Sequence, residues 1–368
     1  MIPKIGIVHE RFTEPGGSEK VVEALGDLWP DARLHAPVID QTVSFGAVDK
    51  LTHSSTWLQN LYRNDGRYAH LLPLLPAAMQ SIDLSPYDLV VLSHHAFANR
   101  VRIPEEVRTL SYVHTPARWF WDARLRAADA PGGIARVGLG VFAASQRRAD
   151  RAAAARIDML VANSSEVANR IRTWWGLDAT VVHPPVDVDL FTPDPTVERE
   201  PFFLLAGRLV PYKRPEVAIA AAAEAGVRLV VAGTGRSEKA CRAVAGKDVE
   251  FLGEVSDSEL RDLFRRCSAL VFPGIEDFGI VPVEAQACGA PVIGVRAGGL
   301  CDTVVPGRTG ILVPESPDPS QVVASLAKAM RSGEVDSIDS DVCVGNASRF
   351  SQSRFAEEIS SLASDLLE

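Results

Sequence analysis

The sequence predicts an α/β protein with two doubly wound parallel-sheet domains. Its 368 residues, 46% of them hydrophobic, are more than one domain core usually holds. An apolar run, a glycine loop and a helical segment follow one another near the start of the chain, and the same order returns after residue 202. That order is typical of the opening of a doubly wound sheet. Between the two copies, residues 183–201 are rich in proline and acidic residues and lack periodicity, which predicts a linker.

Composition excludes several classes of function. The net charge of -9 argues against a nucleic-acid binder. All five cysteines lie in the second half without a CxxC or Cys/His cluster, so we expect reduced, buried thiols. The chain starts in a strand-like run, and no apolar stretch approaches the roughly 18 residues that span a bilayer. We therefore expect a cytoplasmic protein without a signal peptide.

The first domain opens with a predicted strand over residues 5–8 and a predicted helix over residues 18–28. Gly16 and Gly17 lie between them, where glycine lets the backbone approach a ligand closely. Ser18 is placed to cap the helix. A plain tight turn is the alternative role for the glycine pair.

A loop rich in aromatic residues follows a predicted strand that starts at Arg108. It carries His114 near the carboxyl end of that strand, which is where ligands bind in open α/β sheets. We predict His114 as a site residue, although a single histidine is also common in a protein core. The aromatic residues after it either stack on sugar faces or pack in the core: Trp119, Phe120 and Trp121.

Residues 134–157 predict an amphipathic helix with a cluster of arginines at positions 147, 148, 151 and 156. A solvated basic face is the ordinary role of such a cluster. The alternative is contact with anionic lipid at a membrane surface, where an acceptor built on a lipid diphosphate would lie.

The second domain begins with a predicted strand over residues 202–206, followed by Arg208, Lys213 and a helix from about Pro215. Both cations lie at a strand-to-helix junction, where a bound diphosphate would need countercharge. Ordinary surface charge is the alternative.

A GxG spacing at Gly233 and Gly235 hints at a dinucleotide-binding loop, but Glu238 occupies the place of the third glycine. Farther along, Ser256 is placed to cap a helix.

Residues 270–291 hold the most specific pattern, a strand, a glycine loop and a helix. Glu276 and Glu284 stand on either side of seven residues, and Pro282 is placed at a first helical position. The loop should point backbone N–H groups at a ligand above the sheet, where phosphate or sugar oxygens fit. The alternatives are a plain helix cap for Glu284 and a solvated loop acid for Glu276.

This stretch resembles the signature of retaining glycosyltransferases of family 4, whose hallmark is two glutamates with seven residues between them. The resemblance rests on that spacing, the FGI loop, the Glu-Ala helix, the Cys-Gly-Ala-Pro turn at residues 288–291 and the later residues 310–313. It extends to IGIVHERFTEPGGSEKVV at the start of the chain and to GRLVPYKRP, in which Arg214 stands where many relatives have glycine.

The resemblance spans nearly the full chain and implies the GT-B architecture, two Rossmann-like domains that face each other across a cleft. It also implies a last helix that crosses back onto the first domain. We therefore expect a first, acceptor-side domain of residues 1–185 and 348–368, a linker of residues 186–201, and a donor-binding domain of residues 202–347.

The resemblance further implies the roles of individual residues. Arg208 and Lys213 would stabilise a departing diphosphate, Glu276 would position sugar hydroxyls, and His114 would orient the sugar or the acceptor. Residues 253–255 resemble the place where these enzymes contact the base, and Glu284 should bind the ribose. The full set implied to bind substrate is Gly16, Gly17, Arg208, Lys213, Gly253, Glu254, Val255, Phe278, Gly279, Ile280, Val281 and Glu284. We identify no DxD-type metal site in the sequence, so we expect neither metal nor cofactor.

The implied reaction is transfer of a hexose from a nucleoside diphosphate sugar with retention of configuration. GDP-mannose is the favoured donor, because the His-Thr-Pro loop at residues 114–116 is similar to that of bacterial mannosyltransferases of polysaccharide assembly. A UDP-sugar is the alternative donor, and the acceptor is a saccharide, a lipid-linked molecule or a small metabolite. An epimerase or phosphorylase of the same fold, a nucleotide-binding oxidoreductase and an inactive sugar-binding scaffold are competing functions. Peripheral contact with an anionic inner membrane face is a further expectation.

Overall fold

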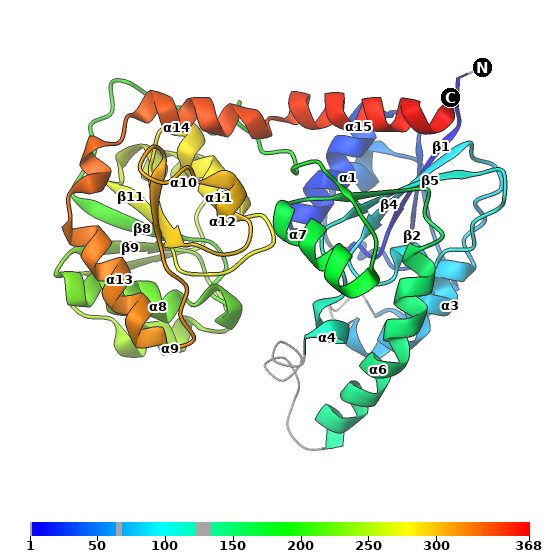
Figure 1. Ribbon diagram of the computed structural model, residues 1–368, viewed down its shortest axis with the longest axis horizontal. Helices are drawn as coiled ribbons and strands as arrows, with labels where there is room; N and C mark the ends of the chain where they lie inside the picture. The colour runs from blue at the N-terminus through cyan, green and yellow to red at the C-terminus, as the bar shows by residue number, and fades with distance from the viewer. Residues whose placement is uncertain (1, 64–67, 123–133) are drawn as a thin grey trace. The chain divides into compact units, whose positions relative to one another are not determined.

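The computed structural model describes residues 2–63, 68–122 and 134–368 (Figure 1). The chain divides into two compact units, one of residues 1–185 with 355–368 and one of residues 186–354. Each unit is built on a single sheet whose described strand pairs are all parallel. The predicted fold class, two Rossmann-like parallel-sheet domains, is confirmed.

The first unit holds a seven-stranded sheet in the order β3-β2-β1-β4-β5-β6-β7. The chain moves outward from β1 to β3 and then returns to β4 on the other side of β1, so the strand order reverses between β1 and β4. The strands are β1 Ile5–His9, β2 Arg33–Ala36, β3 His53–Ser55, β4 Leu89–His94, β5 Arg108–Val113, β6 Met159–Ala162 and β7 Thr180–Val181. The α-helices described in this unit are α1 Gly17–Leu28, α2 Gly46–Lys50, α3 Leu75–Gln80, α4 Arg118–Trp121, α6 Ile134–Ala154, α7 Ser165–Arg170 and most of α15 Gln352–Leu367.

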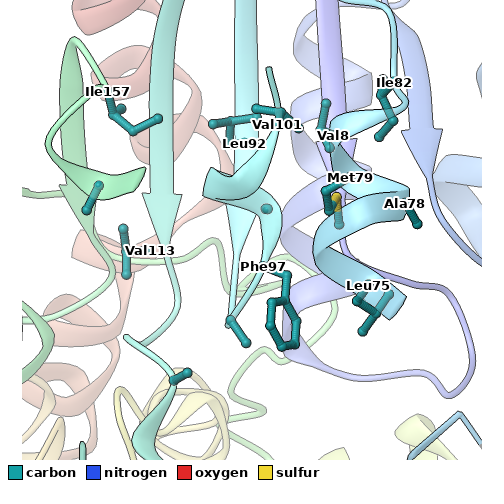
Figure 2. Close-up of a cluster of buried hydrophobic side chains, with 14 of the residues drawn as sticks. Val8, Leu75, Ala78, Met79, Ile82, Leu92, Phe97, Val101, Val113 and Ile157 are labelled. Carbon is teal, nitrogen blue, oxygen red and sulfur yellow. The ribbon is translucent and has the colours of Figure 1, made fainter. Parts of the chain in front are cut away.

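Both faces of the first sheet are buried, because alternate residues of each strand point to opposite faces. Val90 and Leu92 of β4 belong to one apolar cluster, whereas Leu89 and Val91 belong to the other. Figure 2 shows part of the first cluster, in which Val8 of β1 and Leu92 of β4 lie near side chains of α3 such as Met79. Continuous apolar strands of this kind are typical of parallel sheets covered on both sides.

The second unit holds a six-stranded sheet in the order β10-β9-β8-β11-β12-β13, and its strand order reverses between β8 and β11. The strands are β8 Phe202–Ala206, β9 Arg228–Ala232, β10 Val249–Gly253, β11 Ala269–Phe272, β12 Val292–Val295 and β13 Gly310–Val313. The helices are α8 Pro215–Ala225, α9 Glu238–Val244, α10 Asp257–Arg266, α11 Ile280–Ala287, α12 Leu300–Thr303, α13 Pro319–Arg331 and α14 Ser340–Ala347. Phe202 and Leu204 face one core, and Phe203 and Leu205 face the other.

The segment between the two sheets packs with the second unit. Val186 and Phe191 are each 1% exposed and lie in the core that also contains Phe202. Residues 186–201, which the sequence suggests as a linker, are therefore part of the second unit.

The C-terminal segment passes from the second unit to the first at residue 354. Phe350 is buried in the core of the second unit, whereas Phe355, Ile359 and Ala363 of α15 are buried in the core of the first. This i, i+4, i+8 spacing places the three side chains on one face of the helix. The return to the first unit thus begins at residue 355 rather than 348.

Two helices begin earlier than the sequence suggests. Helix α1 begins at Gly17 with Gly16 as its N-cap, and the Ser18 hydroxyl donates to Glu19 Oε2 at 2.8 Å instead of capping the helix. Helix α11 begins at Ile280, so Pro282 is its third residue rather than its first. Proline is tolerated there because the N–H groups of the first turn have no partner within the helix.

All five cysteines are free, and four are buried as expected, but Cys301 is exposed. Burial raises the pKa of Cys267 to about 12. Within the described ranges, no helix combines the length and the apolar character needed to cross a membrane.

Candidate functional site

The carboxyl edge of the second sheet brings two predicted site residues into contact. Lys213 lies in a short 3-10 turn after β8, and Glu276 lies in the loop after β11. Their Nζ and Oε1 atoms are 2.7 Å apart, and the two side chains are 17% and 16% exposed. Strands β8 and β11 are the neighbours between which the strand order reverses, and ligands of open α/β sheets bind at that point.

Glycines let the loops at this edge pack closely around Lys213. A Cβ on Gly274 would lie 2.8 Å from Lys213 Cα, and a Cβ on Gly207 would lie 3.4 Å from Lys213 Nζ. The exposed Arg208 follows Gly207 directly, so it lies on the same loop. The structure thus brings Lys213 into contact with Glu276. Arg208 lies on the loop between β8 and Lys213.

The GxG pair supports the β8 loop. Cβ atoms on Gly233 and Gly235 would lie 2.1 and 2.3 Å from the carbonyl oxygens of Gly207 and Leu209. Leu209 N–H also donates to the Thr234 carbonyl at 2.8 Å. The spacing that hints at a dinucleotide motif therefore serves loop-to-loop packing.

The loop before α11 is held from behind by a second pair of glycines. Gly299 N–H donates to the Glu276 carbonyl at 2.9 Å, and Cβ atoms on Gly298 and Gly299 would lie within 2.2 Å of the backbone of Glu276 and Phe278. Gly279 has a φ of 88°, a left-handed conformation that favours glycine. These contacts fix the path of the backbone that leads into α11.

The remaining predicted residues of this loop and helix have unequal access to a ligand. Phe278 is 3% exposed and packs edge-on against Phe350, so its side chain belongs to the core. Glu284 is 5% exposed and is the fifth residue of α11, not its cap. Ile280 and Val281 form the first turn of α11 and are half-buried.

The predicted base-contacting segment follows β10. Gly253 ends that strand with a φ of 76°, and its carbonyl accepts a hydrogen bond from Gly233 N–H at 2.6 Å. Ser256 caps α10 as expected and forms a capping box with Glu259. Residues 253–255 therefore reach the same edge of the sheet as Lys213, since all carboxyl ends of parallel strands lie on one edge.

Arg214 has a left-handed backbone, with a φ of 51°, and is the one described residue other than glycine with a positive φ. Glycine adopts this conformation without strain, which explains why glycine suits this position. The loop keeps its shape with arginine there at an energetic cost.

At the carboxyl edge of the first sheet, His114 directly follows β5 and is 7% exposed. Its Nε2 lies 2.8 Å from Ser93 Oγ, and its ring stacks on that of His95 with centroids 4.5 Å apart. Burial, with the nearby His95 and His9, holds the pKa of His114 well below its usual value. The imidazole is therefore neutral near pH 7.

Three neighbours of His114 extend the cluster. Ser93 Oγ also lies 3.0 Å from His9 Nδ1, and His9 Nε2 lies 3.3 Å from Glu19 Oε1. Burial alone would raise the pKa of Glu19, but hydrogen bonds with His9 and Ser18 outweigh it and lower the pKa to about 2. Glu19 is thus ionised across the physiological range.

The glycine pair lies beside this cluster. Gly16 is extended, with a φ of -165°, and a Cβ on it would lie 3.0 Å from Glu19 Oε2. The space next to the carboxylate therefore favours a small residue at position 16. Gly17 opens α1 directly after it.

Glu10 anchors the loop after β4. Its Oε1 accepts backbone N–H bonds from four consecutive residues, His95, Ala96, Phe97 and Ala98. Burial opposes the charge, but His94 and these N–H groups lower the pKa of Glu10. The loop that carries His95 is consequently fixed to the end of β1.

The aromatic residues after His114 have protein partners. Phe120 is fully buried, Trp119 stacks on Phe142, and Trp121 donates its indole N–H to Asp150 at 2.9 Å. Packing in the core is thus the role that the structure supports.

Three arginines of the predicted basic segment also have internal partners, although helix α6 ends at Ala154 rather than at residue 157, so Arg156 lies just beyond it. Arg147 and Arg151 donate to the carbonyls of Phe120 and Trp174, and Arg156 donates to that of Val101. These bonds tie the helix to its own unit.

Sequence reasoning missed His9, Glu10, Glu19, Ser93 and His95. Apart from Glu19, which lies in the first turn of α1, these are polar residues at the ends of apolar strand runs, a pattern typical of the functional edge of a parallel sheet. The register of strands β1, β4 and β5, which brings these residues together, cannot be deduced from the sequence.

Comparison with protein families identifies both halves of the chain. Residues 15–190 match the model described as Glycosyltransferase Family 4, and residues 190–339 match the model described as Glycosyl transferases group 1. The two halves of the chain are therefore similar to two successive glycosyltransferase domains.

Curated relatives are similar over part of their length. A D-inositol 3-phosphate glycosyltransferase 2 of Catenulispora acidiphila is 35% identical over 46% of this chain and 47% of its own. A D-inositol 3-phosphate glycosyltransferase of Mycobacterium bovis is 36% identical over 42% of this chain and 38% of its own. The similarity thus spans less than half the length of these relatives.

Solved structures share the fold over the full chain. Sucrose-phosphate synthase from Thermosynechococcus elongatus has a TM-score of 0.72 at 18% identity and covers 99% of each chain. Anabaena HepE in complex with UDP and glucose has a TM-score of 0.67 at 17% identity and covers 99% of this chain and 100% of its own. At these identities the likeness shows the GT-B fold alone.

Proposed function

We propose that this protein is a retaining glycosyltransferase that moves a hexose from a nucleoside diphosphate sugar to a saccharide, a lipid-linked molecule or a small-molecule acceptor. The observation that carries the proposal is the Lys213–Glu276 ion pair, 2.7 Å long, between the two strands where the order of the second sheet reverses. The matches of both halves to glycosyltransferase families support it.

In the proposed reaction, Lys213 and Arg208 offset the charge that develops on the departing diphosphate. Backbone N–H groups of residues 278–281 add hydrogen bonds, as helix N-termini do for anions. Electrostatic stabilisation of a leaving group is commonly the largest contribution to catalysis. The chemistry asked of these residues requires no metal, so we expect activity to survive EDTA.

Glu276 has two tasks in this proposal. It holds the Lys213 ammonium in place before the donor binds, and its carboxylate accepts hydrogen bonds from sugar hydroxyls near the reacting carbon. Glu284 binds the ribose, and residues 253–255 contact the base. A diphosphate oxygen takes the proton of the acceptor hydroxyl as the new bond forms on the same face of the sugar.

The first unit supplies His114 and the Gly16-Gly17 turn for the sugar and the acceptor. GDP-mannose is our first candidate donor, because residues 114–116 are similar to the loop of bacterial mannosyltransferases. A UDP-sugar is the second, and the HepE complexes with UDP favour it. The inositol phosphate named for the curated relatives is a candidate acceptor.

A thermal-shift panel tests the proposed function. UDP, GDP, ADP and TDP, each alone and as a sugar conjugate, are added to the protein, with NAD as the comparison. We expect one of the four nucleoside diphosphates to raise the melting temperature of the protein most. We expect its sugar conjugate to be turned over. Stronger stabilisation by NAD than by every nucleoside diphosphate would contradict the proposal and favour the oxidoreductase alternative.

Contact of α6 with membrane remains a separate prediction. Sedimentation with anionic vesicles, compared with neutral vesicles, measures it directly. Equal amounts of protein in the pellets of anionic and neutral vesicles would contradict contact of α6 with anionic lipid.

A further inference from the structure

A line of hydrogen bonds leads from helix α1 to His114 in the first unit. Glu19 Oε1, the His9 ring, Ser93 Oγ and His114 Nε2 follow one another at separations of 3.3, 3.0 and 2.8 Å. Strand register explains the line, because His9 of β1 pairs with Ser93 of β4, and Ser93 pairs with Tyr112 of β5. His114 lies two residues beyond Tyr112, so it points to the same face.

Burial leaves these groups few alternatives. His9 is 1% exposed, Ser93 is fully buried and His114 is 7% exposed. Buried polar groups need hydrogen-bond partners, and a buried network has a defined direction once one end is fixed. Glu19 fixes that end, because an ionised carboxylate only accepts hydrogen bonds.

The direction can be followed atom by atom. His9 must donate its Nε2–H to Glu19, so a neutral His9 has its lone pair on Nδ1. That lone pair accepts the single hydroxyl hydrogen of Ser93. Ser93 Oγ can then only accept from the ring of His114, which places the hydrogen of that ring on Nε2.

We infer that Glu19, His9 and Ser93 form a positioning relay that fixes His114 as the Nε2–H tautomer and leaves Nδ1 as a hydrogen-bond acceptor for a substrate hydroxyl. Glu19, His9 and Ser93 act through His114, and the inference rests on the proposed function for its link to catalysis. The relay requires that the His9 ring is neutral and carries a single N–H hydrogen. An imidazolium at His9 would donate from both nitrogens and would reverse every later bond.

The tautomer determines what His114 can recognise. A lone pair at Nδ1 accepts from an O–H group and repels the oxygen of a phosphate. Within the described residues Nδ1 makes no hydrogen bond of its own, whereas Nε2 is held by Ser93. We therefore assign His114 to a sugar or acceptor hydroxyl and the diphosphate to the second unit.

Nitrogen NMR of the full-length protein labelled with ¹⁵N-histidine tests the relay without any substrate. The His114 signals are assigned by their loss in His114→Asn. We expect wild-type His114 to show a protonated Nε2 and an unprotonated Nδ1. A protonated Nδ1 in the wild type would overturn the inference.

Two variants and a matched control test the cause. Ser93→Ala and Glu19→Gln should each give a mixture of the two His114 tautomers. Ser93→Ala removes the hydroxyl that links His9 to His114. Glu19→Gln introduces an amide that both donates and accepts, so it no longer fixes the direction of the hydrogen bonds. Ser111→Ala is the control: Ser111 is also fully buried, lies on β5 and donates to Asn99 at 2.7 Å outside the relay. A single Nε2–H tautomer in Ser93→Ala would contradict the relay.

Kinetics connect the tautomer with turnover. We expect kcat/KM to fall about 10-fold in Ser93→Ala, the loss of one oriented hydrogen bond, and less than twofold in Ser111→Ala. Equal losses in both would show a structural effect only and contradict a positioning role. The NMR result stands even if no sugar nucleotide is turned over, so failure of the relay and failure of the proposed function are distinguishable.

The same labelled protein distinguishes the two sources of the hydroxyl. Saturating GDP-mannose or UDP-glucose is added without acceptor, beside GDP or UDP alone. A His114 Nδ1 shift that appears only with the sugar nucleotide identifies a hydroxyl of the transferred sugar. No shift with the turned-over donor identifies the acceptor hydroxyl, and an equal shift with the bare diphosphate contradicts hydroxyl recognition.

Discussion

The two sheets of this protein follow the same topological rule but are finished differently at their carboxyl edges. In the first unit the edge is filled by buried rings and a hydroxyl, with His9, Ser93 and His114 in one line of hydrogen bonds. In the second unit the edge is built from glycine loops around the Lys213–Glu276 ion pair. The first edge presents side chains, and the second presents backbone and charge.

The difference indicates a division of labour. Close backbone packing and a partly exposed ammonium group suit a diphosphate, which needs many N–H donors and countercharge. The neutral His114 imidazole, held by a hydrogen bond, suits a hydroxyl group, which needs an oriented partner. The proposed function thus uses one fold for two kinds of recognition, through the residues that follow its strands.

The largest effect should come from the ion pair. We expect Lys213→Ala and Glu276→Ala each to lower kcat about 10²–10³-fold, the usual cost of removing one group that stabilises the transition state. The free energy of unfolding should change little in either variant, because both side chains are partly exposed. Lys50→Ala is the matched control, since Lys50 pairs with Asp27 at 2.8 Å on the surface of the first unit. Wild-type turnover in both site variants would refute the assignment.

Glycine packing in the second unit can be tested by adding one methyl group. Gly233→Ala places a Cβ 2.1 Å from the Gly207 carbonyl oxygen at a φ of 138°, so we expect the free energy of unfolding to fall by about 3 kcal/mol. Gly246→Ala has nothing within 4 Å and should change it by less than about 0.5 kcal/mol. Denaturant titration measures both, and equal values would contradict the packing argument.

Acid should weaken the first unit through Glu19. Its pKa is lowered from 4.5 to about 2 in the folded protein, so its stabilising contribution is present above pH 4.5 and is lost as the pH falls toward 2. Relative to Glu19→Gln, the wild type should lose about 2 kcal/mol of unfolding free energy between pH 5 and pH 3. Parallel pH curves for the two proteins would show that the Glu19 carboxylate has no such role.

The smallest effect concerns the strained loop beside Lys213. Arg214→Gly should raise the free energy of unfolding by up to about 1 kcal/mol, because glycine adopts the left-handed conformation at φ 51° without strain. Arg214→Ala keeps the strain and serves as the control. A stability gain of the same size in the alanine variant would assign the effect to the arginine side chain instead.

Local pattern was sufficient to predict the fold class and the placement of two candidate site residues at one edge of the second sheet. Strands β6 and β8 have the predicted limits, and Lys213 and Glu276 were both expected at the rim of the second sheet. Each lies in the loop that follows an apolar strand, so sequence position alone fixes the edge on which it appears.

Features that depend on register or on packing could not be predicted. The relay requires His9, Ser93 and His114, up to 105 residues apart, to align across three strands. The expected linker contains few apolar residues, yet two of them, Val186 and Phe191, are enough to place it in the second unit. Helix starts shifted by one or two residues because glycine and proline are compatible with several positions in a first turn.

The central claim is that Lys213 offsets the charge of a nucleoside diphosphate at the edge of the second sheet. Titration calorimetry of GDP and UDP with wild type, Lys213→Ala and Lys50→Ala tests it most directly. We predict that Lys213→Ala weakens binding of the preferred nucleotide about 10-fold or more, the value of one charge-assisted contact, while Lys50→Ala binds as the wild type does. Equal affinity in all three proteins would contradict the account.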